Sequence, residues 1–154
     1  MKTSIRRLPE LKVVSFEGYS PDPEMQAFRK VEEWIRDHPE DEDRRIFGHN
    51  IDAEGKLSLD PQNAGYKVLV SVNDYPPEKK DLKTEVISPG KFLVVSTGGK
   101  IDSAGQWVME GWQKMNQLID SENLKVKSSP RWYEEHLPSP DPDSMMMDLY
   151  LELE

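Results

Sequence analysis

A short stretch near the C-terminus, Trp132-Tyr133-Glu134-Glu135-His136, gathers the side chains best suited to chemistry. In a β-strand, alternate side chains point to opposite faces, so Trp132, Glu134 and His136 would share one face. Tyr133 and Glu135 would then point to the other face. A carboxylate turned into the interior loses hydration, and burying a lone charge is costly. A glutamate placed there is expected to receive a cation or to act as a general acid or base.

The same spacing also fits an ordinary surface, because Glu134 and Glu135 can both lie in solvent on an edge strand or in a loop. His49, Glu134 and His136 lack the ligand spacing of a zinc site, and the chain has no cysteine. Gly98-Gly99-Lys100 lacks the pattern of a phosphate-binding loop. We therefore expect no metal and no cofactor.

Aromatic side chains elsewhere offer walls for a bound planar molecule. Trp107 falls slightly off the register of its helical repeat, which makes it a candidate for lining a groove. The other candidates lie in or beside predicted strands, and each also fits the hydrophobic core. They are Phe16, Tyr19, Phe47, Tyr66 and Tyr150.

Two similar rounds of strands and helices must position these side chains. In the first round, Asp22-Pro23 predicts the start of a helix over 23–37. In the second round, Asp102 is the expected N-cap of a helix. The predicted strands cover 11–19, 45–51, 66–72, two extended runs around Pro89-Gly90, 123–127, 131–137 and 145–153. Charged or turn-rich connections are predicted at 40–45, 52–65 and 73–81.

This order indicates an internal repeat within one domain of 154 residues, with halves at about 1–78 and 79–154. The expected fold is α+β, with a tandem β-α-β-β repeat and pseudo-twofold symmetry. An antiparallel sheet would carry both helices on one face. A groove between two such helices is a natural place for a ligand.

The net charge of the chain limits the classes of partner that it is expected to bind. The net charge is −9 and the pI is about 4.9, so direct binding to nucleic acid is not expected. The same charge favours a cationic ligand, although it also fits a protein that is simply kept soluble. No signal peptide and no membrane-spanning apolar run is present in the sequence. A cytoplasmic protein without membrane contact is the expectation.

Several of these segments together resemble a known family. The segments RLPELKVVSFEGY, AFRKVEEWI, RIFG and RWYEEHLP followed by MMMDLYLEL are similar to those of the GyrI-like small-molecule-binding domain. That domain is also the effector-binding domain at the C-terminus of some AraC-type and MerR-type regulators. The resemblance covers nearly the whole chain and depends on a scattered pattern, not on one tight motif.

The resemblance implies a central cavity that binds hydrophobic, often cationic, drugs and dyes. In the family, a glutamate in an aromatic-Glu-x-Tyr strand near the C-terminus reaches the cavity and meets the positive charge. Tyr133-Glu134-Glu135-His136 matches that place, so the resemblance gives the role to Glu134. His136 replaces the tyrosine, and the adjacent Glu135 leaves the register open by one residue.

Three functions compete at this point. The first is a stand-alone protein that binds and senses a hydrophobic small molecule, either cationic or neutral. The second, known among GyrI-like proteins, is a hydrolase of reactive cyclopropane-type compounds, with Glu134 as general base. The third is an acidic regulator that binds a protein partner, such as a gyrase modulator. The sequence before residue 11 has no room for a helix-turn-helix, so operator binding by this sequence is not expected.

Overall fold

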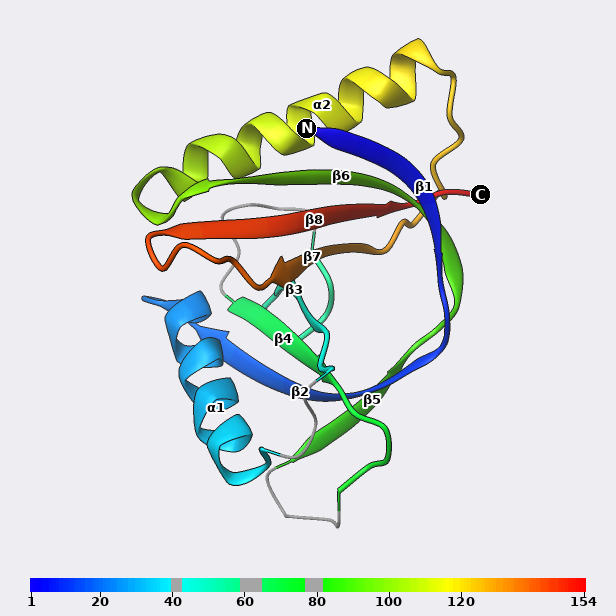
Figure 1. Cartoon of the computed structure of the whole chain (residues 1–154). Coiled ribbons are helices and arrows are strands. Elements are labelled where there is room, and N and C mark those ends of the chain that lie inside the picture. The colour runs from blue at the N-terminus through cyan, green and yellow to red at the C-terminus, as the bar shows by residue number, and fades with distance from the viewer. Residues whose placement is uncertain (40–42, 59–64, 77–81) are drawn as a thin grey trace. The chain divides into compact units, whose positions relative to one another are not determined.

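The structure is a computed structural model that describes residues 1–39, 43–58, 65–76 and 82–154 (Figure 1). Parts of the three predicted connections, at 40–42, 59–64 and 77–81, lie outside the described residues. The chain divides into two compact units. We call residues 10–88 unit A, and residues 1–9 together with 89–154 unit B.

Unit A is an antiparallel sheet with one helix on one face. Its strand order is β3-β4-β2-β5, and α1 packs against β2 and β4. The elements are β2 (Leu11–Tyr19), α1 (Pro23–Asp37), β3 (Ile46–Ile51), β4 (Gly65–Ser71) and β5 (Lys83–Ile87).

The sequence pattern accounts for the packing of α1. Asp22 takes the N-cap position with Pro23 in the first turn, as predicted, although the Asp22 side chain makes no capping hydrogen bond. The Asp22 carbonyl instead accepts the first helical bond, from the backbone N–H of Gln26. The apolar side of the helix meets β2 and β4 in a buried core made of Val14, Ala27, Val31, Tyr66, Val68 and Val70.

Unit B repeats this arrangement with the strand order β7-β8-β6-β1. The helix α2 (Ala104–Ser121) runs along β6 and β8 (Figure 1). The strands are β1 (Lys2–Leu8), β6 (Gly90–Lys100), β7 (Trp132–Leu137) and β8 (Ser144–Glu152). The predicted fold class is confirmed: the chain is α+β, its strands are antiparallel, and each β-α-β-β repeat has its helix on one face of its own sheet.

Three local predictions need correction. Strand β1, which the sequence pattern does not predict, precedes β2 in sequence yet pairs with β6. Asp102 is not the N-cap of α2, because it lies in a short 3-10 turn (Ile101–Ser103) and Ser103 takes the cap position. In place of a strand at 123–127, the structure has a single bridge between Val126 and Leu153.

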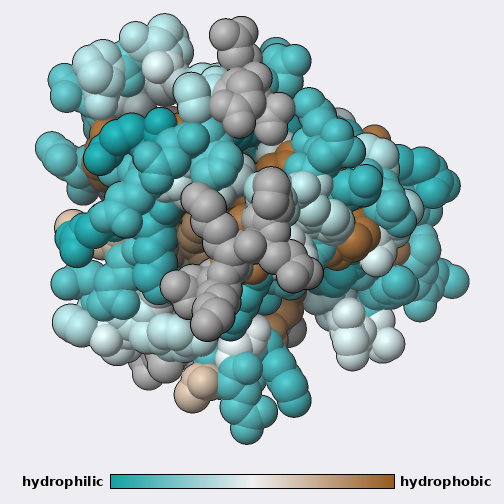
Figure 2. Space-filling view, turned by 90° about the horizontal axis from the view of Figure 1, so that it is seen from below, coloured by the Kyte–Doolittle hydropathy of each residue, from teal (hydrophilic) through white to brown (hydrophobic). Residues whose placement is uncertain are grey.

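The apolar side chains of the described residues are mostly buried in the cores. Figure 2 shows a surface that is largely hydrophilic on the side in view, with hydrophobic side chains in small patches. In the part of the chain that the structure describes, no helix has the length and apolar character needed to cross a membrane.

Candidate functional site

The sheet of unit B has two faces with different chemistry. Residues paired directly across an antiparallel ladder point to the same face, and β7 pairs with β8 so that Glu134 lies opposite Leu149. Leu149 belongs to the hydrophobic core under α2, so Glu134 lies on the face that α2 covers. Glu135 is paired with Asp148 and lies on the opposite face. We call this opposite face the aromatic face, with the central residues Phe92, Tyr133, Glu135, Asp148 and Tyr150.

Glu135 is a buried carboxylate on the aromatic face, with 5% of the residue exposed. The hydroxyl of Tyr150, on the adjacent strand β8, donates a hydrogen bond of 2.6 Å to Glu135 Oε1. This length is typical of a hydroxyl bound to a charged oxygen. The carboxylate is therefore held in one orientation on a rigid strand.

Three aromatic residues lie on the same face of the sheet as this carboxylate. The centroid of the Phe92 ring lies 6.0 Å from that of Tyr133 and 5.8 Å from that of Tyr150. The Phe92 and Tyr150 rings meet nearly edge to face, at 78°. Such pairs fall in the favoured range for aromatic contacts, and all three residues are buried. The face therefore combines ring surfaces with a negative charge.

Two further carboxylates on this face are paired with cations. Asp148 accepts hydrogen bonds from Arg6 Nη1 at 2.8 Å and from the Ser96 hydroxyl at 2.5 Å. Glu152 receives Arg131 Nη2 at 2.7 Å. Burial alone would raise the pKa of Glu152, but hydrogen bonds from the side chain and backbone of Arg131 outweigh it and lower the pKa to about 2. These two acids therefore have clear structural partners.

The α2 face holds three of the predicted ligand-binding residues. Trp132 is buried, and its ring meets that of Trp112 from α2 edge to face, with centroids 5.6 Å apart. Glu134 and His136 follow at alternate positions and are half-buried. Trp132 thus packs against the helix and does not contribute to the aromatic face.

Burial lowers the pKa of His136 to about 4, because an imidazolium there would lose hydration; the charge of Glu135 opposes this shift. The unfolded chain takes up a proton near pH 6.5, whereas the folded chain does so near pH 4. Stability is therefore lost as the pH falls between these values, by about 3 kcal/mol in all.

We expect His136→Gln to abolish this loss. Urea unfolding at several pH values should show that the free energy of unfolding falls by about 3 kcal/mol more for the wild type than for the variant between pH 7 and pH 4. The carboxylates titrate in both proteins, so their contribution cancels when the two unfolding free energies are subtracted. Parallel pH profiles for the two proteins would contradict the burial of a neutral imidazole.

Trp107 takes part in two environments of unit B. It belongs to the core under α2, and its indole Nε1 donates to the carbonyl of Lys100 at 2.9 Å. Its ring fills the space beside Gly99, where a Cβ atom would approach Trp107 Cδ1 to 2.6 Å. It also lines a surface depression of about 370 Å³ together with Glu110 and Met146.

The four predicted site residues of unit A divide between the two faces of its sheet. Phe16 and Tyr66 lie on the α1 face, where the Phe16 ring is 6.0 Å from Trp34 and Tyr66 is buried. Tyr19 and Phe47 point to the opposite face, because they alternate with residues on the α1 face. No single face of this sheet therefore carries all four.

The two residues on that opposite face differ in character. Phe47 is fully buried, with the guanidinium of Arg45 5.0 Å from its ring centroid. Tyr19 donates a hydrogen bond of 2.7 Å to Glu17, and this bond raises the pKa of Tyr19 to about 12. The Tyr19 phenol is therefore protonated at neutral pH and is unsuited to act as a base.

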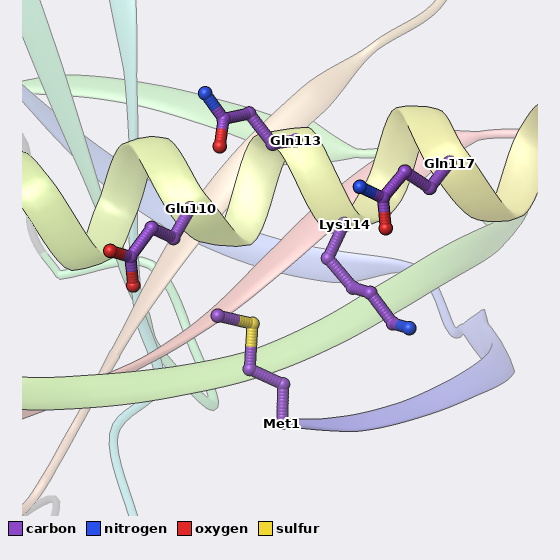
Figure 3. Close-up of a pocket in the computed structure, with 5 residues that line it drawn as sticks. All are labelled: Met1, Glu110, Gln113, Lys114 and Gln117. Atoms are coloured by element: carbon purple, nitrogen blue, oxygen red, sulfur yellow. The ribbon is translucent and has the colours of Figure 1, made fainter.

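A separate polar depression of about 430 Å³ lies between the start of β1 and α2. Figure 3 shows that Met1 approaches it from β1, while the polar side chains come from α2. They are Glu110, Gln113, Lys114 and Gln117. In the described ranges, no three His, Cys, Asp or Glu side chains gather closely enough to hold a metal ion.

Comparisons with known proteins place this geometry in context. No protein-family model matches the sequence, and no curated protein is significantly similar to it. Solved structures do match over almost the whole chain. The C-terminal domain of EcmrR superposes with a TM-score of 0.69 at 18% identity, covering 99% of this chain and 97% of that one.

A longer EcmrR chain, from the structure of an EcmrR-DNA complex in EcmrR-RPo, matches with a TM-score of 0.72 at 15% identity. The match covers 99% of this chain, which thus spans 57% of the EcmrR chain.

Two other solved structures are also similar. A hydrolase from Listeria innocua has a TM-score of 0.64 at 14% identity, covering 99% of this chain and 92% of that one. SAV2435 bound to tetraphenylphosphonium has a TM-score of 0.57 at 12% identity, covering 100% of this chain and 94% of that one. The expected resemblance to GyrI-like domains is thus confirmed at the level of the fold.

Proposed function

We propose that this chain is a small-molecule-binding protein that holds a hydrophobic cation against the aromatic face of unit B, with Glu135 as the carboxylate that meets the positive charge. The observation that carries this proposal is the burial of Glu135, at 5% exposure, on the face of the sheet that also carries Phe92, Tyr133 and Tyr150. Glu135 takes the role that the family resemblance gave to Glu134. In this role the protein would sense or sequester its ligand.

Burying a carboxylate costs free energy, because the charge loses its hydration. The Tyr150 hydroxyl donates to Glu135 Oε1 at 2.6 Å and holds this buried carboxylate in place. A cationic ligand supplies the opposite charge in a place where water screens it little. The attraction between the ligand and Glu135 is therefore stronger here than at the surface.

The aromatic rings add to this attraction. Each ring face that contacts a cation contributes about 0.5 to 2 kcal/mol, with the larger values for desolvated sites. Phe92, Tyr133 and Tyr150 are buried and lie on the same face as Glu135. Ring surfaces impose little directional bonding, so we expect the protein to accept several hydrophobic cations of different shape.

The comparisons support this proposal through the fold. SAV2435 shares the fold and its structure was determined with tetraphenylphosphonium, a hydrophobic cation. EcmrR shares the fold through its C-terminal domain. Tetraphenylphosphonium is therefore a suitable first probe for this chain.

Calorimetric titration of the wild-type protein tests the proposal. We expect tetraphenylphosphonium to bind at least about tenfold more tightly than triphenylphosphine oxide, a neutral compound with similar rings, because one desolvated charge contact is worth about 1.4 kcal/mol or more. Thermal denaturation should show the same order of stabilisation. Equal affinities for both compounds, or no binding of either, would overturn the proposal.

A hydrolase is the second candidate, because the Tyr150 hydroxyl orients the Glu135 carboxylate as a general base requires. The likeness in fold to a hydrolase from Listeria innocua supports keeping this candidate. In this role Glu135 would take a proton from a water molecule as the water oxygen attacks an electrophilic carbon of a strained ring. The ring C–C bond breaks, its electron pair stays on the other carbon, and that carbon then takes the proton back from Glu135, so that water is added across the broken bond. Turnover of a cyclopropane-containing electrophile by the wild type, followed by mass spectrometry and lost in Glu135→Gln, distinguishes catalysis from binding alone.

A further inference from the structure

We propose that Arg6 sets the charge class of the ligand: by occupying Asp148, the second buried carboxylate near Glu135, it makes the site favour singly charged over doubly charged cations. The inference rests on the proposed function, because it assumes that Glu135 meets the ligand. Strand β1 would then contribute to ligand specificity, although it lies at the other edge of the unit B sheet from β7.

The two carboxylates are direct neighbours across the sheet. Glu135 on β7 is paired with Asp148 on β8, and each is 5% exposed. Side chains paired in this way have Cβ atoms about 4.5 to 5.5 Å apart, and like charges there repel each other. A ligand that touches Glu135 therefore lies within the field of Asp148.

Arg6 and Ser96 hold both oxygens of Asp148. Arg6 Nη1 lies 2.8 Å from Oδ2, and the Ser96 hydroxyl donates to Oδ1 at 2.5 Å. The hydrogen bond to Asp148 is the main cause that raises the pKa of Arg6, and the phenol of Tyr150 adds to it. That phenol is the one that donates to Glu135.

The consequence for the ligand follows from counting charges on this pair. Arg6 and Asp148 together contribute no net charge, so a second positive charge on the ligand gains little from Asp148. Without the Arg6 guanidinium, a buried Asp148 carboxylate would attract the second charge of a dication. Without the Asp148 carboxylate, the Arg6 cation would repel a dication more strongly than a monocation.

A matched pair of flat cations tests this inference. N-methyl-4-phenylpyridinium and 1,1′-dimethyl-4,4′-bipyridinium share a two-ring framework and carry one and two positive charges. The readout is the ratio of their association constants, measured by calorimetry. We expect Arg6→Gln to raise the ratio of dication to monocation affinity about tenfold and Asp148→Asn to lower it about tenfold.

The conservative and double variants provide controls. Arg6→Lys keeps the positive charge and should keep the ratio near the wild-type value. In the double variant Arg6→Gln/Asp148→Asn, positions 6 and 148 again contribute no net charge, so the affinity ratio should return to the wild-type value. If Arg6→Gln is too unstable to measure, the fall expected for Asp148→Asn still tests the inference with the opposite sign.

Failure of this inference can be told apart from failure of the proposed function. If the monocation binds and loses affinity in Glu135→Gln, but neither Arg6→Gln nor Asp148→Asn changes the ratio, the role of Arg6 is refuted and the proposed function stands. If neither cation binds to the wild type, or if Glu135→Gln has no effect on binding, both are refuted.

Discussion

Glu135→Gln is expected to weaken the binding of tetraphenylphosphonium by about 30-fold or more, which corresponds to at least about 2 kcal/mol. Glutamine has nearly the same shape and can still accept the hydrogen bond from Tyr150, so the change removes charge with little change in packing. A loss of this size is expected because the carboxylate is buried and its attraction to a cation is weakly screened. Calorimetric titration of both proteins measures it.

Glu134→Gln is the matched control, because it makes the same chemical change one residue earlier on the same strand. Glu134 lies on the α2 face, so we expect the affinity to change by less than about threefold, as for a charge outside the binding contact. Affinity for triphenylphosphine oxide should be unchanged in both variants. If Glu134→Gln caused the larger loss, the choice of Glu135 as the ligand-binding residue would be wrong.

Gly18→Ala is expected to destabilise the folded chain by about 3 kcal/mol or more. A Cβ atom at Gly18 would collide with the carbonyl oxygen of Pro23 and would lie 2.7 Å from the backbone N of Ala27. Both obstacles belong to the backbone of α1, so no side chain can turn aside to make room. Urea unfolding monitored by circular dichroism measures the loss.

Gly105→Ala is the control for this change, since it adds the same methyl group elsewhere. Gly105 lies in the first turn of α2 with open space where its Cβ would be, so alanine should stabilise the protein by about 0.5 kcal/mol through its higher helix propensity. If Gly18→Ala proved as stable as the wild type, the close approach of β2 to the start of α1 would be incorrect.

The elements with strong local signals could be predicted from the sequence. The strand at 11–19 and the helix at 23–37 occur with the predicted boundaries. β-branched and aromatic residues define the strand locally, and Asp22-Pro23 with an apolar stripe defines the helix. The strand β1 could not be predicted in the same way. Its segment KTSIRRL has little apolar bulk, and it becomes a strand through its ladder with β6, which is a tertiary interaction.

The orientation of Glu134 and Glu135 was the main question that the sequence left open. The family pattern favoured Glu134 because Tyr133 directly precedes it, whereas the ladder puts Glu135 on the same side as Tyr150. One signal in the sequence did bear on this choice. Along β8, the polar residues Asp148, Tyr150 and Glu152 alternate with apolar ones, which predicts a polar face that sequence reasoning did not exploit.

The remaining residues of the aromatic face were missed for a related reason. Phe92 lies in an apolar run that offers no periodic contrast, and Arg6 lies in the strand that was not recognised. Conversely, the chemistry of Trp132 suits a ligand contact, but its ring packs against Trp112 under α2. Residue type indicates what a side chain can do, but the pairing of strands decides which face it reaches.

A crystal structure of the chain with tetraphenylphosphonium would show which face of unit B receives the cation. We expect the phosphorus atom to lie within about 6 Å of the Glu135 carboxylate, with phenyl groups against rings of the aromatic face. A cation bound beside Glu134 on the α2 face, or bound elsewhere with the aromatic face unoccupied, would contradict this expectation.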